Sequence, residues 1–181
     1  MALVFSATVH GSDESEPLTV ELYRISGSSA RELRKELDRL GPVDSDGVRH
    51  DGHTQWFITL TYQLDPDADG CEMLSFETKL DITMTLPKWD RSKGAPARLV
   101  NQWERYNGAL RLHEDGHYDI AVAAAKEIRR RVEGQRGAVD CQALGRDIDA
   151  TAETVLLEYR RQEVEYDKRT KHGQAQGAQF P

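Results

Sequence analysis

Hydrophobic and polar residues alternate over two long segments in the first half of the chain. Residues 54–63 carry large apolar side chains at every second position, and residues 74–86 follow the same pattern more strictly. A period of two is typical of half-buried antiparallel strands. The connecting residues 65–70 are rich in turn formers, and the apolar segment 18–25 predicts one more strand.

Three other segments carry the signals of helices. A short helix is expected over residues 31–40, because Ser29 and Glu32 form a capping box before it. The second half of the chain predicts two long helices with apolar stripes, from about residue 96 to 133 and from about 144 to 170. Beyond them, the residues up to 181 are expected to form a tail.

The order of these elements, strands first and long helices later, predicts an α+β fold. We expect an antiparallel sheet with a short N-terminal helix, packed against the two long C-terminal helices. No linker divides the chain, and 181 residues of which 38% are hydrophobic suit one core. The prediction is therefore a single domain over 1–181, with its core at about 17–173 and with termini at 1–16 and 174–181.

Composition excludes several classes of partner. The chain has 24 basic and 31 acidic residues, a net charge of −7, and lacks any Lys/Arg-rich run, so no nucleic-acid partner is expected. No stretch approaches the roughly 20 apolar residues of a membrane span. The first residues are too short and insufficiently basic for a signal peptide, so we expect either a cytoplasmic protein or the mature form of an exported one.

The most informative residues are His113, Glu114 and His117, which form an H-E-x-x-H motif within the first long helix. Residues four apart lie one turn apart on the same helix face, so both imidazoles can bind one Zn²⁺ ion. Glu114 can then act as general base toward a water on that ion. Gly116 lowers helix stability by about 1 kcal/mol relative to alanine, which indicates a close approach of a strand or substrate backbone.

A catalytic zinc site needs a third protein ligand. The second long helix is its expected source, because the inward stripe of that helix continues toward its C-terminal end. We rank His172 first, Asp167 second and Glu163 third. Tyr166 is the candidate for a hydrogen bond to an oxyanion near the metal.

Two other pairs of residues leave alternatives open. His50 and His53 lie in a glycine-containing loop, where a solvated loop is a simpler interpretation than a second metal site. Cys71 and Cys141 belong to no C-x-x-C motif. They fit a single long-range disulfide and two buried thiols equally well.

Several stretches taken in order resemble a bacterial family, domain of unknown function 922, whose members are described as predicted secreted zinc-dependent proteases. The resemblance extends over about residues 17–180. Its most specific parts are HEDGHYDIA at 113–121 and Y-D-x-x-T-x-H-G at 166–173.

The resemblance implies a zincin-like hydrolase with His113 and His117 as ligands and Glu114 as base. It places the remaining ligand in the block 166–173. It also implies export to the periplasm or the medium, and a bridge between Cys71 and Cys141.

These arguments lead to a zinc-dependent metallopeptidase that hydrolyses a protein or peptide substrate. The exposed edge of the strand over residues 74–86 is the expected place for that substrate to pair. The first alternative is a metal-binding, non-hydrolytic module that binds a partner. The second is a structural domain in which the motif is accidental.

Overall fold

The computed structural model describes residues 18–67, 70–135 and 140–181; the expected N-terminal extension 1–16 lies outside them. Every strand and helix expected from the sequence is present. The strands β2 and β3 extend beyond the alternating segments 54–63 and 74–86 that predicted them. In chain order the elements are β1 (Leu18–Ile25), α1 (Ala30–Leu40), β2 (His53–Asp67), β3 (Gly70–Trp89), α2 (Ala97–Glu133), α3 (Cys141–Thr170) and the short 3₁₀ helix η1 (Gln174–Gln176).

The three strands form one mixed sheet in the order β1-β3-β2. β2 and β3 pair antiparallel, whereas β1 runs parallel to β3, so the expectation of an antiparallel sheet was wrong. Alternation reports which face of a strand is buried, and it carries no information on the direction of the neighbouring strand. The strand expected to offer its edge to a substrate, β3, pairs with β2 over residues 70–85 and with β1 only over residues 82–89, so among the described residues its second edge is covered from Ile82 onward and uncovered over residues 74–81.

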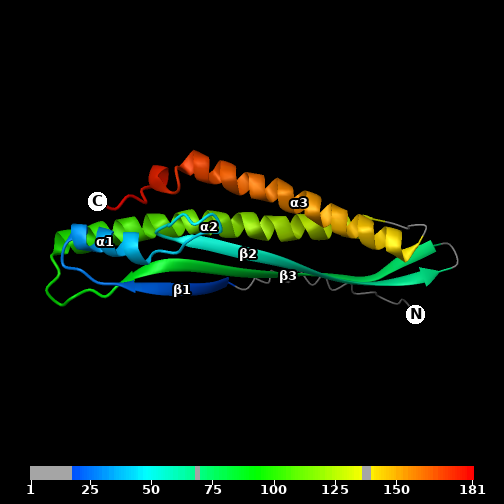
Figure 1. Cartoon of the computed structure of the whole chain (residues 1–181), viewed down its shortest axis with the longest axis horizontal. Helices are drawn as coiled ribbons and strands as arrows, with labels where there is room; N and C mark the ends of the chain where they lie inside the picture. The colour runs from blue at the N-terminus through cyan, green and yellow to red at the C-terminus, as the bar shows by residue number, and fades with distance from the viewer. Residues whose placement is uncertain (1–17, 68–69, 136–139) are drawn as a thin grey trace, which may run out of the picture.

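The two long helices lie on the same side of the sheet (Figure 1). Helix α2 packs directly on the sheet, where Ala121 and Ala125 allow close contact with Leu80 and Ile82 of β3. Helix α3 runs along α2 and reaches the sheet near its own N-terminus. The arrangement buries the middle of α2 on two sides, and the H-E-x-x-H motif lies in that middle.

A disulfide joins Cys71, at the start of β3, to Cys141, the first residue of α3. The bridge that the family resemblance implied is therefore confirmed in the structure. Cys71 is buried in an apolar cluster that α2, α3 and the far end of the β2–β3 hairpin form together. The disulfide thus ties the second long helix to the sheet at one end of the molecule.

The residues after α3 pack back onto the helices. Lys171 and His172 both have positive φ angles and turn the chain around at the end of α3. Phe180 is only 8% exposed and lies in an aromatic cluster with Trp103 and Tyr106 of α2. Residues 174–181, expected as a terminus beyond the core, therefore contribute to it.

Across the described residues, none of the helices is long and apolar enough to cross a membrane.

Candidate metal centre

Helix α2 presents His113, Glu114 and His117 toward the interior of the protein. All three are buried, because the same helix face packs on the sheet and beneath α3. The two imidazole rings lie one helical turn apart, with centroids 4.9 Å from each other. The i, i+4 spacing of the motif thus brings two nitrogen ligands to one point.

Asp167, in the last turn of α3, supplies a carboxylate at the same point. Its Oδ1 atom lies 3.2 Å from His113 Nε2 and 3.1 Å from His117 Nε2. Among the residues that the structure describes, His113, His117 and Asp167 form the single group of three or more possible ligands whose ligand atoms all lie within 4.8 Å of one another. This buried group can hold a metal ion.

The other two candidates for third ligand lie next to this group. Glu163 Oε1 lies 3.3 Å from His117 Nδ1, the nitrogen directed away from Asp167, and also accepts a hydrogen bond from Trp56 Nε1 at 2.9 Å. The side chain of His172 is 63% exposed, and its Nδ1 lies 3.5 Å from Asp167 Oδ1. The sequence ranked His172 above Asp167, and the geometry brings Asp167 closer to the histidine pair.

The charges of the site are strongly coupled. Burial lowers the pKa of His117, but hydrogen bonds to Asp167 and Glu163 outweigh that effect and raise it to about 10. Burial likewise raises the pKa of Asp167, and hydrogen bonds from His113 and His117 overcome this and hold it well below its usual range. A cation at this position would therefore meet a carboxylate that stays ionised.

Glu114 is 3% exposed, and one of its carboxylate oxygens accepts no hydrogen bond from the residues that the structure describes. Its Oε2 accepts a hydrogen bond from Thr54 Oγ1 at 2.8 Å. Its Oε1 faces Gly52, where an added Cβ would lie 2.8 Å away. Burial raises the pKa of Glu114, and the Thr54 hydrogen bond offsets part of that rise. Sequence reasoning missed Thr54, because no motif links it to a residue 60 positions later.

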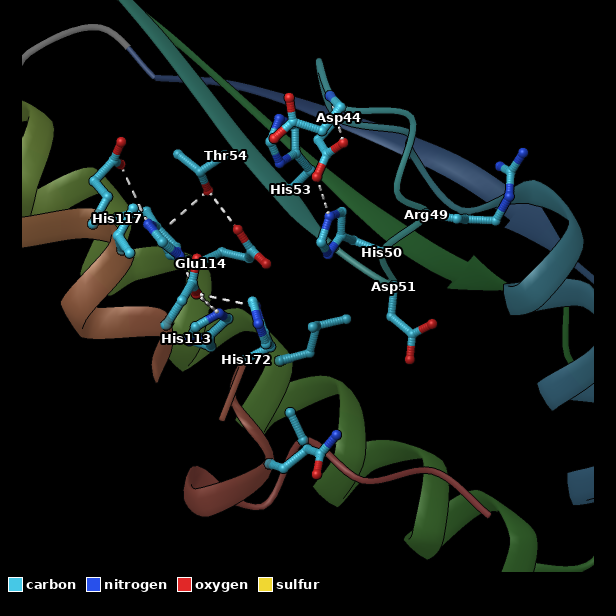
Figure 2. Close-up of a pocket in the computed structure, with 18 of the residues that line it drawn as sticks. Asp44, Arg49, His50, Asp51, His53, Thr54, His113, Glu114, His117 and His172 are labelled. Atoms are coloured by element: carbon cyan, nitrogen blue, oxygen red, sulfur yellow. Dashed lines mark hydrogen bonds and ion pairs between the residues drawn. The ribbon is translucent and has the colours of Figure 1, made fainter. Parts of the chain in front are cut away.

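A cavity of about 690 Å³ opens beside these residues (Figure 2). Its walls are α2, α3, the residues after α3 and the loop between α1 and β2. His50 of that loop and His53, the first residue of β2, line the cavity with stacked rings, and His50 Nε2 lies 2.7 Å from Asp44 Oδ2. His172 lies across from His50, with ring centroids 6.1 Å apart. In the described part of the chain these histidines form no second group with metal-ligand spacing.

A partly buried polar network holds the cavity loop in place through Asp51. The guanidinium of Arg34 in α1 binds both carboxylate oxygens of Asp51. Tyr106 of α2 donates to the same carboxylate at 2.6 Å, and Tyr23 of β1 donates to the Asp51 carbonyl at 2.7 Å. Three elements therefore fix the loop that carries His50 and leads into His53.

This network predicts a loss of stability at alkaline pH. Burial and then the Asp51 charge raise the pKa of Tyr106 well above 10. In the unfolded chain a tyrosine hydroxyl ionises near pH 10. The free energy of unfolding is therefore retained below that pH and falls above it, by up to about 1.4 kcal/mol per pH unit for each tyrosine with a raised pKa. The free energy of unfolding, measured with urea at several pH values between 9 and 11, should fall less steeply with pH in Tyr106→Phe than in wild type. Equal slopes would contradict this assignment.

Gly116 makes room for a side chain of α3. An added Cβ at Gly116 would lie 2.1 Å from Tyr166 Oη and 2.3 Å from its Cζ. The Tyr166 ring also stacks on His113, with centroids 5.2 Å apart and planes 9° from parallel. The close approach expected at this glycine is therefore made by a tyrosine side chain instead of a strand backbone.

Substituting Gly116 with alanine should destabilise the protein by about 1–2 kcal/mol, because the clash outweighs the helix propensity gained. Gly108→Ala provides the matched control on the same helix. Nothing lies within 4 Å of an added Cβ there, so this variant should gain about 0.5–1 kcal/mol. Chemical denaturation measures both values. A stabilised Gly116→Ala variant would show that Tyr166 does not need this space.

Comparison with known proteins identifies one family. The family model described as "Bacterial protein of unknown function (DUF922)" matches residues 20–173. No curated protein and no solved structure matches the chain significantly.

Proposed function

The chain belongs to the DUF922 family, whose function is unknown, and we propose from its buried site that it is a zinc-dependent metallopeptidase. The observation that supports this proposal is the convergence of two imidazoles and one carboxylate beside a buried glutamate, at the wall of a cavity. Each of these parts has a chemical role in hydrolysis.

The ligand set suits zinc in a catalytic site. Zinc binds nitrogen and oxygen donors, and catalytic sites use three protein ligands with one position left open. His113, His117 and Asp167 provide three such donors. Zinc in this position would lower the pKa of a water molecule and polarise the carbonyl of the bond to be cleaved.

Glu114 is suited to move the proton in this reaction. Thr54 holds one carboxylate oxygen, which leaves Oε1 to accept a proton from the attacking water as it adds to the carbonyl carbon. The same oxygen can then pass the proton to the departing amine nitrogen. Burial raises the pKa of Glu114 and so makes it a better base than an exposed glutamate.

A peptide substrate can approach along β2, which forms one edge of the sheet. This strand begins at His53, and its second residue, Thr54, contacts Glu114. An extended peptide that pairs with this edge would therefore pass close to the general base. His172, exposed across the cavity, is the side chain best placed to meet a developing oxyanion.

The disulfide favours an extracellular or periplasmic location. Disulfides persist in oxidising compartments and are rare in the cytosol. We therefore propose that the protein acts outside the cytoplasm, as the family resemblance implied.

Metal removal tests this function directly. Purified protein should contain about one zinc ion per chain by elemental analysis, and should cleave members of a random peptide library. Chelation should abolish cleavage and added zinc should restore it. Stoichiometric zinc without any cleavage would favour the non-hydrolytic binding module, and absence of stoichiometric zinc would overturn the metal site itself.

A further inference from the structure

A residue in the segment after α3 contacts Nδ1 of His113, the ring nitrogen that faces away from Asp167. Gln176, in the 3₁₀ helix η1, places its Oε1 atom 3.1 Å from His113 Nδ1. The Nε2 atom of the same ring faces Asp167. Gln176 is thus on the side of the imidazole opposite to the candidate metal position.

Two more hydrogen bonds connect Gln176 back to His113. Gln176 Nε2 donates to Tyr166 Oη at 3.2 Å, and Tyr166 Oη donates to the backbone carbonyl of His113 at 3.1 Å. Together the three bonds form a closed ring that begins and ends at one residue. The carbonyl of His113 can only accept, so Tyr166 Oη donates to it and the Tyr166 oxygen accepts from the amide nitrogen of Gln176. The amide oxygen of Gln176 must face the imidazole, and Nδ1 must carry a proton.

The segment that carries Gln176 is held in a fixed position. Gly173 has a φ of +80°, and an added Cβ there would lie 3.1 Å from two atoms of His113. Gly177 follows η1 with a φ of +101°, and Phe180 is buried against Trp103 and Tyr106. The alternative partner, Thr170 Oγ1, lies farther from His113 Nδ1, at 3.5 Å, and donates its own proton to the Tyr166 carbonyl at 2.8 Å.

We infer that Gln176 is a positioning residue for the metal centre: it holds His113 in the Nδ1-protonated tautomer and so directs the Nε2 lone pair at the metal. Metal-bound histidines need such a partner on the second nitrogen, and its loss typically weakens metal affinity by 10–100-fold. The inference rests on the metal site of the proposed function and is independent of peptidase activity.

The ring also assigns a role to Tyr166. Its hydroxyl donates a hydrogen bond to the His113 carbonyl, and the hydroxyl oxygen accepts one from the Gln176 amide. Tyr166 therefore belongs to the same positioning system, and not to the groups that would meet an oxyanion.

Zinc affinity measured by competition with a chromogenic chelator tests the inference. Gln176→Ala should bind zinc 10–100-fold more weakly than wild type. Gln176→Glu should recover affinity to within about threefold, because a carboxylate oxygen also accepts a hydrogen bond from the Nδ1–H group. Gln174→Ala is the matched control: Gln174 lies in the same 3₁₀ helix, and among the described residues it forms hydrogen bonds only through its backbone. This control should bind zinc like wild type.

A second measurement reports on the imidazole without metal. With ¹⁵N-labelled histidine, the Nδ1 proton of His113 should be protected from exchange in wild type and in Gln176→Glu, and should exchange fast in Gln176→Ala. Wild-type affinity in Gln176→Ala, or equal weakening in Gln174→Ala, would overturn the inference. If wild type binds no zinc, the metal site and this inference fail together, whereas zinc binding without peptide cleavage overturns the peptidase and leaves the inference standing.

Discussion

Replacing Glu114 with glutamine is expected to slow peptide hydrolysis by about 10²–10⁴-fold while zinc binding stays at one ion per chain. Glutamine has the shape of glutamate, and its carbonyl oxygen can still accept the hydrogen bond from Thr54. It cannot take a proton from water at neutral pH. The metal ligands lie on other residues, so the variant should separate chemistry from metal binding.

The hydrolysis rate is measured on a peptide that wild type cleaves, and the zinc content of the same preparation is measured by elemental analysis. Glu133→Gln is a suitable control, because Glu133 is exposed at the end of the same helix and lies outside the cavity. This control should hydrolyse peptide at the wild-type rate. Full activity in Glu114→Gln would refute the role of Glu114 as base, and loss of zinc would assign it to the metal centre instead.

Local patterns in the sequence predicted the elements well, and they predicted strand direction poorly. Alternation over residues 54–63 and 74–86 marks the faces of β2 and β3, and the capping box at Ser29 marks the start of α1. The parallel pairing of β1 with β3 depends on where the chain returns after α1. No periodicity encodes that return, which is why the mixed sheet was not anticipated.

For the site as well, the sequence predicted the geometry within one helix and failed where distant segments meet. His113 and His117 could be paired from the sequence because a helix fixes their geometry within one turn. The end of α3 was predicted correctly, and the choice between Asp167 and His172 depended on the direction of the chain just beyond it. The helix reaches Thr170, so Asp167 still points inward, whereas His172 lies in the left-handed turn beyond it.

Contacts between distant segments had no signal in the sequence. Thr54 reaches Glu114 because the first residues of β2 run beside the middle of α2. Gln176 reaches His113 because the chain folds back after α3. Both depend on tertiary packing, and side chains of threonine and glutamine are too common to stand out by type.

Removing the disulfide is expected to lower the free energy of unfolding by about 4 kcal/mol, because the bridge closes a loop with a sequence separation of 70 residues. A Cys71→Ala/Cys141→Ala double variant and wild type reduced with dithiothreitol should both show this loss in urea unfolding. Agreement between the two excludes an effect of the alanine side chains. Reductant should leave the double variant unchanged, since the described residues contain no free cysteine.

The same variant should retain the zinc affinity of wild type under conditions where it stays folded. Cys141 is the first residue of α3 and Asp167 lies in its last turn, so the disulfide and the metal centre are at opposite ends of one helix. The bridge acts on the unfolded chain, by limiting its conformations, and contributes no ligand. A loss of less than about 1 kcal/mol would contradict this account, in which the bridge stabilises the protein by restricting the unfolded chain. A parallel loss of zinc affinity would instead show that this anchor sets the position of Asp167 along α2.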